Sequence, residues 1–301
     1  MRTIGIAIVL VLLVVTHAVA DDTLPAPGME SADRGSVSDD QEKPQQETIT
    51  ITGKRLPESE LVGAYNQPVW TTTRRFPTTR VYVIPAGAVS FEYWFNPEGK
   101  FQSGAQASYE SRYEVEFGLG KRFQFDLYLI TDQEEGRYKP LNIGSEELEL
   151  RWALADWGTL WGNPTLYASW SHQNSSPQNL EAKVLAGDQI NPKLFWGANL
   201  VYERELGGKT KQEYAVSVGL AYVLVDGVFS AGLEGKITMA EEKGPSSDFT
   251  KKEFLFGPSL QLKPIYGIHI DLVPLFGAEI ADKTYPMYSI FFIIGKEISG
   301  Y

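Results

Sequence analysis

Cysteine is absent from the 301-residue sequence, and histidine occurs only three times. Without cysteine the protein has no disulfide scaffold, no Cys-ligated zinc and no thiol nucleophile. The sequence also lacks a P-loop, a zinc-binding motif and the Gly-x-Ser-x-Gly elbow of hydrolases. We therefore predict that the protein is not an enzyme, with no catalytic residues, no metal site and no cofactor.

Long apolar runs and positive charge are also scarce. Beyond residue 20, no run approaches the roughly 20 apolar residues that a transmembrane helix needs. Residues 1–20 combine Arg2, a short apolar stretch and Ala18-Val19-Ala20, the pattern of a cleaved signal peptide rather than of an uncleaved anchor. Removal of Arg2 from the 27 basic residues leaves 26 against 38 acidic residues, a net charge of −12. Such an acidic chain offers no electrostatic surface for nucleic acid.

The segment after the signal peptide is poor in aliphatic residues. Residues 21–46 consist largely of Asp, Glu, Pro, Ser and Gln, and such a composition cannot bury enough apolar surface to order the chain. We predict a disordered periplasmic tail there. Residues 56–85 contain four prolines, Trp70 and the basic pair Arg74-Arg75. We expect these residues to form an irregular linker that docks at the mouth of the fold that follows.

Between these two segments lies a short run with period-2 alternation, residues 47–55. Its alternating members are Thr48, Ile49, Thr50, Ile51 and Thr52. The run resembles the TonB box of TonB-dependent outer-membrane receptors. That resemblance implies that TonB is a partner and that it binds by adding this strand to its own sheet. Fewer than 40 residues separate the run from the first expected barrel strand, too few for the folded plug of such receptors. A sticky linker, or a strand that enters the barrel, is therefore the alternative.

From residue 86 onward the main signal is alternation between apolar and polar or small residues. In residues 213–239, Tyr214, Val216 and Val218 alternate with small residues, and the alternation resumes after a turn at residues 225–227. Such a hairpin has one apolar face. In a soluble sandwich that face would pack on a second sheet, whereas in a membrane barrel it would face lipid.

The alternation predicts twelve strands. They cover residues 88–96, 108–119, 123–131, 146–154, 165–172, 179–186, 193–205, 213–222, 229–239, 253–263, 268–280 and 285–298. Tight turns follow the even-numbered strands, and mostly longer polar loops follow the odd-numbered ones, which is the asymmetry of outer-membrane barrels. We predict an all-β fold, a closed antiparallel up-and-down transmembrane β-barrel of about 12 strands over residues 86–301.

The end of the chain agrees with this prediction. Tyr301 follows an apolar strand and resembles the terminal aromatic of the outer-membrane assembly signal, although Glu297 and Ser299 occupy positions that are usually hydrophobic. Over residues 86–301 the architecture resembles barrels loosely grouped with the phenol-degradation meta-pathway outer-membrane family. The resemblance implies a Gram-negative outer-membrane location, with outer-membrane lipid and the barrel assembly machinery as partners.

Charged residues occupy inward positions of the first four expected strands. They are Glu92, Arg112, Glu114, Glu116, Asp126, Glu147, Glu149 and Arg151. Six acids against two bases leave this wall of the lumen negative. On the opposite wall, Glu181 and Lys183 are expected to pair, as are Glu234 and Lys236. The negative wall predicts a porin-like pore or transporter for a small solute, with cation preference set by the acids.

Three alternatives stay open. The charges could instead form a salt-bridged filling of the lumen, the barrel could be a TonB-linked accessory protein, or it could be a non-conducting protein that binds a partner. The sequence does not favour an enzyme. Asn174, not serine, lies two residues after His172, which departs from the His-x-Ser of outer-membrane lipases. We expect His269 and Asp271 to form a hydrogen-bonded pair in the lumen.

Overall fold

The computed structural model describes residues 56–134, 142–173, 177–207, 211–242 and 249–298. The expected signal peptide, the acidic tail, the TonB-box-like residues 47–55 and the C-terminal Tyr301 all lie outside the described residues. Within the described ranges, no helix is long and apolar enough to cross a membrane.

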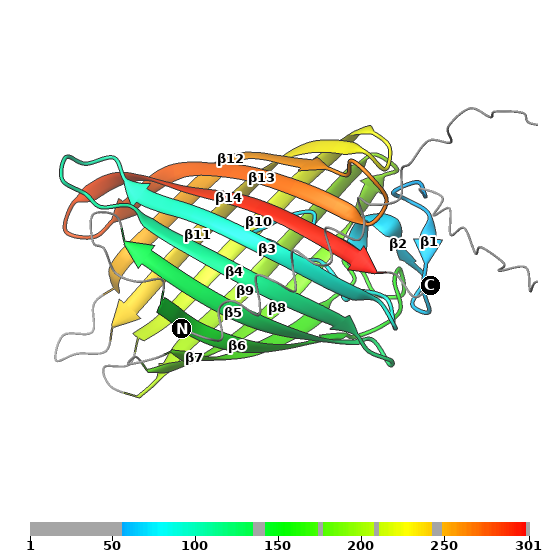
Figure 1. Cartoon of the computed structure of the whole chain (residues 1–301), viewed down its shortest axis with the longest axis horizontal. Helices are drawn as coiled ribbons and strands as arrows, with labels where there is room; N and C mark the ends of the chain where they lie inside the picture. The colour runs from blue at the N-terminus through cyan, green and yellow to red at the C-terminus, as the bar shows by residue number, and fades with distance from the viewer. Residues whose placement is uncertain (1–55, 135–141, 174–176, 208–210, 243–248, 299–301) are drawn as a thin grey trace, which may run out of the picture. The chain divides into compact units, whose positions relative to one another are not determined.

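Twelve antiparallel strands close into a barrel, as predicted (Figure 1). They are β3 Val89–Lys100, β4 Ser108–Gly118, β5 Phe123–Glu134, β6 Asn142–Ala153, β7 Thr165–Gln173, β8 Gln178–Asn191, β9 Leu194–Leu206, β10 Lys211–Val225, β11 Phe229–Glu242, β12 Phe249–Leu262, β13 Ile268–Ile280 and β14 Thr284–Ile298. Each strand pairs with the next along the chain, and the ring closes where β14 pairs with β3, for example Ile293 with Trp94. The two-sheet sandwich is therefore excluded for this part of the chain.

The alternation of side chains separates an apolar outer face from an enclosed lumen. On β10, Val216 and Val218 are exposed, whereas Ala215 and Ser217 are buried inside the barrel. The same division holds on β12, where Phe254 and Phe256 are exposed and Leu255 is buried. A strand has period 2, so an apolar residue at every second position produces a continuous apolar outer surface.

The strand connections differ between the two ends of the barrel. At one end, here called the short-turn end, tight turns join β4 to β5, β10 to β11 and β12 to β13. These turns need left-handed backbone at Lys121, Arg122, Gly227 and Gly267, with φ of 59°, 63°, 65° and 69°. The opposite end, where β3 and β5 end, is here called the long-loop end.

Residues 56–87, here called the plug, run into the lumen from the short-turn end. They contain the short pair β1 Leu61–Val62 and β2 Gln67–Pro68 and the 3-10 helix η1 Val69–Thr71 (Figure 1). The sequence predicted an irregular segment at the mouth of the barrel, but the chain goes further inward. Trp70 and Phe76 are fully buried, and Val81 lies with them in a cluster that includes Phe195 of the wall.

Glycines on the inner wall make room for the plug. A Cβ atom added at Gly219 would lie 2.6 Å from the ring of Phe76, and one added at Gly187 would lie 2.4 Å from Val81. Because real Cβ contacts are longer, these positions require glycine while the plug is in place. The wall of β8 to β10 is therefore shaped to fit this segment.

Candidate functional site

The acidic residues of the inner wall come together because strand register places them opposite one another. Glu92 on β3 pairs with Glu114 on β4, and Glu116 on β4 pairs with Asp126 on β5. Asp126 in turn lies opposite Glu149 on β6. All five are buried. Like charges placed directly opposite one another destabilise a sheet, so this arrangement requires partners.

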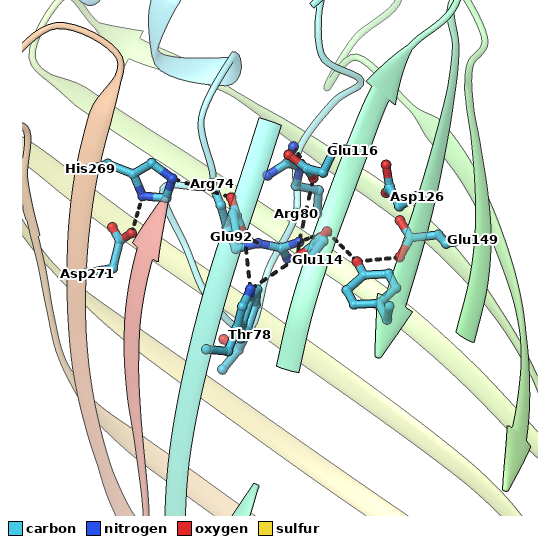
Figure 2. Close-up of polar contacts among 12 residues, drawn as sticks. Arg74, Thr78, Arg80, Glu92, Glu114, Glu116, Asp126, Glu149, His269 and Asp271 are labelled. Atoms are coloured by element: carbon cyan, nitrogen blue, oxygen red, sulfur yellow. Dashed lines mark hydrogen bonds and ion pairs between the residues drawn. The ribbon is translucent and has the colours of Figure 1, made fainter. Parts of the chain in front are cut away.

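The plug supplies two of these partners, Arg74 and Arg80 (Figure 2). Arg74 Nε lies 3.1 Å from Glu92 Oε2, and its Nη2 lies 3.1 Å from Glu114 Oε1. Arg80 Nη2 lies 2.8 Å from Glu116 Oε1. Burial disfavours the charge on Arg74, but Glu114 and Glu92 outweigh it and raise the pKa well above the ordinary value, so the side chain stays cationic.

Arg151 of β6 completes this cluster from the wall. Its Nη2 lies 3.0 Å from Asp126 Oδ2, and its Nε contacts Glu149. Tyr128 donates to Glu114 Oε1 at 2.5 Å and lies 2.8 Å from Glu149 Oε2. The buried part of the predicted negative wall therefore contacts three arginines, Arg74, Arg80 and Arg151, and the first two come from outside the barrel strands. The sequence predicted an excess of acids because it counted only the charges on the barrel strands and left out Arg74 and Arg80.

The predicted pair of His269 and Asp271 is confirmed, with 2.6 Å between Nδ1 and Oδ2. His269 Nε2 also lies 3.4 Å from Glu92 Oε1, which joins the pair to the arginine cluster (Figure 2). His269 reaches Glu92 across Gly295, where an added Cβ would lie 2.0 Å from Nε2. Gln261 donates from Nε2 to Asp271 Oδ1 and to the carbonyl of Arg74, both at 2.8 Å. The wall thus holds both the side chain and the backbone of the plug.

A second ion-paired contact holds the start of the plug. Glu58 lies 2.7 Å from Arg75 Nη2 and 3.1 Å from Lys263 Nζ, the latter at the end of β12. Arg75 Nη1 also donates to Ser230 Oγ at 2.8 Å. Burial raises the pKa of Glu58, but Lys263 and Arg75 outweigh that effect and lower it, so the carboxylate is ionised at neutral pH.

The long, tryptophan-rich connection after β6 lies against the plug. Trp157 packs edge-on against Trp70 and Tyr82, with ring centroids 5.6 Å and 5.1 Å away. Its backbone N–H donates to the carbonyl of Tyr65 at 2.9 Å. The β4–β5 and β10–β11 turns also contact the plug, where Tyr65 donates to the carbonyl of Leu119 at 2.7 Å and the backbone N–H of Glu58 donates to Asp226 Oδ1 at 3.0 Å, but this connection adds aromatic packing.

A cavity of about 410 Å³ remains on the other side of the plug. Arg74, Pro77, Thr78 and Arg80 form its floor. Its walls extend toward the long-loop end, as the lining residues Glu98 near the end of β3 and Glu110 near the start of β4 show. The plug therefore fills one half of the lumen and leaves a cavity in the other half.

The remaining predicted lumen residues line this cavity. Arg112 pairs with Glu110 at 2.5 Å, and Glu147 accepts a hydrogen bond from Tyr167 at 3.3 Å. The predicted pair of Glu181 and Lys183 is present at 2.6 Å.

The predicted pair of Glu234 and Lys236 is wrong. Glu234 instead accepts hydrogen bonds from Thr78 Oγ1 at 2.5 Å and from Ser259 Oγ at 2.8 Å. The plug competes for this carboxylate because Thr78 offers it both a hydroxyl and a backbone N–H.

No protein-family model matches the sequence, and no curated protein matches it. Among solved structures, the fold is similar to an outer-membrane channel from Pseudomonas putida F1, with a TM-score of 0.52, 11% identity, and coverage of 72% of this chain and 98% of that one. The NanC porin gives a TM-score of 0.47, also at 11% identity, over 68% of this chain and 98% of that one. The KdgM porin gives 0.39 at 11% identity, over 70% of this chain and 99% of that one. The first similarity supports the barrel fold alone, and the other two are too distant to carry an argument.

Proposed function

We propose that the protein is an outer-membrane channel for a small solute and that the plug controls passage through it. The observation that carries this proposal is the lumen itself, in which a charged cavity of about 410 Å³ ends on a plug held by ion pairs. A barrel with a purely structural role needs no such cavity, because small barrels fill their interior with side chains. The apolar outer face suits lipid, which supports the outer-membrane location.

The contacts of the plug suit a segment that can leave the lumen. Most of its strong contacts with the wall are ion pairs and hydrogen bonds, and water would hydrate both partners once they separate. A buried ion pair is often no more stabilising than apolar packing, because each charge loses its hydration on burial. The apolar cluster around Trp70 and Phe76 sets the resistance to release.

Conductance in planar bilayers tests this proposal. The full-length protein should show low conductance, and the double variant R74Q/R80Q should open more often because it loses the ion pairs to Glu92, Glu114 and Glu116. The matched control is R122Q, since Arg122 pairs with Asp156 in a partly exposed turn. Conductance that is equal in all three proteins would show that the plug does not control the channel. An absence of conductance in all three would favour a non-conducting, partner-binding barrel.

A TonB-linked accessory barrel is the second candidate. The observation in its favour is that the plug begins directly after residues 47–55, so that a pull on them would act first on the contact of Glu58 with Lys263. Deletion of residues 47–55 should then abolish solute uptake while the barrel still assembles. The resemblance to the phenol-degradation meta-pathway family is also part of this proposal. It is a prediction about the solute that the channel carries and about the proteins to which the chain is related.

A further inference from the structure

One side of the cavity is apolar, although the lumen of a water-filled barrel is generally polar. Leu255, Phe291 and Trp94 line the cavity from β12, β14 and β3. Leu255 packs with Val273, Leu275 and Met287, and Phe291 lies against this cluster. Trp94 meets Phe291 edge-on, with ring centroids 6.4 Å apart. This apolar wall offers a surface for a hydrophobic body inside the lumen.

The acidic and basic side chains that line the cavity do not balance one another. Most of the lining charges have an ion-pair partner, as in Glu110 with Arg112 and Glu181 with Lys183. Among the described residues, the carboxylates of Glu98, Glu147 and Glu203 line the cavity and form no ion pair. Lys236 is the one lining ammonium, among the same described residues, that forms no ion pair either. Three unpaired acids against one unpaired base favour a cation.

Strand register identifies the carboxylate that needs a cation most. Glu203 on β9 lies directly opposite Glu181 on β8 and directly opposite Glu213 on β10. Glu181 is compensated by Lys183 at 2.6 Å, and Glu213 by Lys211 at 3.6 Å. Glu203 stands between two acids and, in the described part of the chain, has no ion-pair partner. A bound cation would relieve the repulsion along this row.

We propose that the cavity binds a small amphipathic cation, namely an ammonium or guanidinium group carried on an apolar or aromatic body. The cationic group binds at Glu203, and the body lies against Leu255, Phe291 and Trp94. The volume of about 410 Å³ falls within the range of small-molecule sites. This inference rests on the proposed channel function and names the class of solute that it would carry.

Calorimetry with the full-length protein in detergent tests this inference, with phenethylammonium as the probe. Benzoate, methylammonium and benzyl alcohol are the comparison compounds, because each lacks either the positive charge or the apolar body. The wild-type protein should bind phenethylammonium more tightly than all three. E203Q should weaken binding about tenfold or more, because a charged contact is lost. E146Q, which makes the same change at an exposed position, should leave binding unchanged.

The apolar wall needs its own variant, since charge alone could attract the probe. L255S should weaken the binding of phenethylammonium but leave that of methylammonium unchanged, and heat-modifiable migration on gels shows whether the barrel has folded. Preference for benzoate, or equal binding by wild type and E203Q, would overturn the inference even if the channel conducts. Binding without conductance in any variant would instead overturn the channel function and leave the site in place.

Discussion

Both halves of the lumen are lined by carboxylates at the inward positions of the strands, but the plug fills one half and a cavity remains in the other. At the short-turn end the inward positions of β3 to β6 carry carboxylates that arginines of the plug and of the wall compensate. At the long-loop end the inward positions also carry carboxylates, but there a cavity remains and some of them have no ion pair among the described residues. The difference shows that the barrel strands alone do not decide whether a lumen is filled, because the plug supplies both the volume and the charge.

Substitution of Arg74 should weaken the binding of the plug in the filled half of the lumen more than any other change considered below. R74A leaves Glu92 and Glu114 buried without their main cation, and the loss of one partner of a buried pair costs about 3–5 kcal/mol. We expect the plug to become accessible to protease while the barrel stays closed, as measured by limited proteolysis with mass spectrometry. R122A is the control, because its pair with Asp156 is partly exposed and contributes at most about 1 kcal/mol. Equal protease resistance of R74A and wild type would contradict this assignment.

Gly219 tests whether shape as well as charge holds the plug. G219A adds a Cβ that would lie 2.6 Å from the ring of Phe76, and such overpacking costs about 1–3 kcal/mol. We expect faster proteolysis of the plug, by a smaller factor than in R74A. The double variant G219A/F76A should remove part of this effect, since the clash is then gone. G120A serves as the control, because no atom lies within 4 Å of a Cβ at that position.

Glu58 makes the short-turn end sensitive to acid. Its pKa lies below the ordinary value of 4.5, so its ionised form stabilises the plug above about pH 4.5. That stabilisation is lost as the pH falls through the lowered pKa, when the contacts with Lys263 and Arg75 weaken. The protection of backbone amides in residues 56–62 against hydrogen exchange, measured relative to the intrinsic exchange rate at each pH, should therefore decrease below pH 4.5. This loss of protection should be smaller in E58Q and unchanged in E60Q, which alters an exposed side chain.

The strands of the barrel could be predicted from the sequence, but the plug and the apolar wall could not. Period-2 alternation is local, so residues 213–239 alone indicate a lipid-facing hairpin. The contact between Arg74 and Glu114 spans 40 residues, and the proline-rich plug has no period to read. The excess of acids on the first four strands was itself a signal, because buried acids require cations and Arg74-Arg75 stood just upstream. The apolar wall was hidden because residues 290–294 are apolar throughout and carry no alternation.

The pair of Lys183 and Glu181 should give the smallest effect, since it lies in the cavity rather than under the plug. Both side chains are partly exposed, at 22% and 19%, so that water screens the pair and its loss costs about 1 kcal/mol or less. K183M should therefore leave the barrel and the protease resistance of the plug unchanged. It should still shift reversal potentials in bilayers toward cations, because Glu181 then joins Glu203 as an unpaired acid in the cavity. An unchanged reversal potential would show that these carboxylates do not face the conducting path.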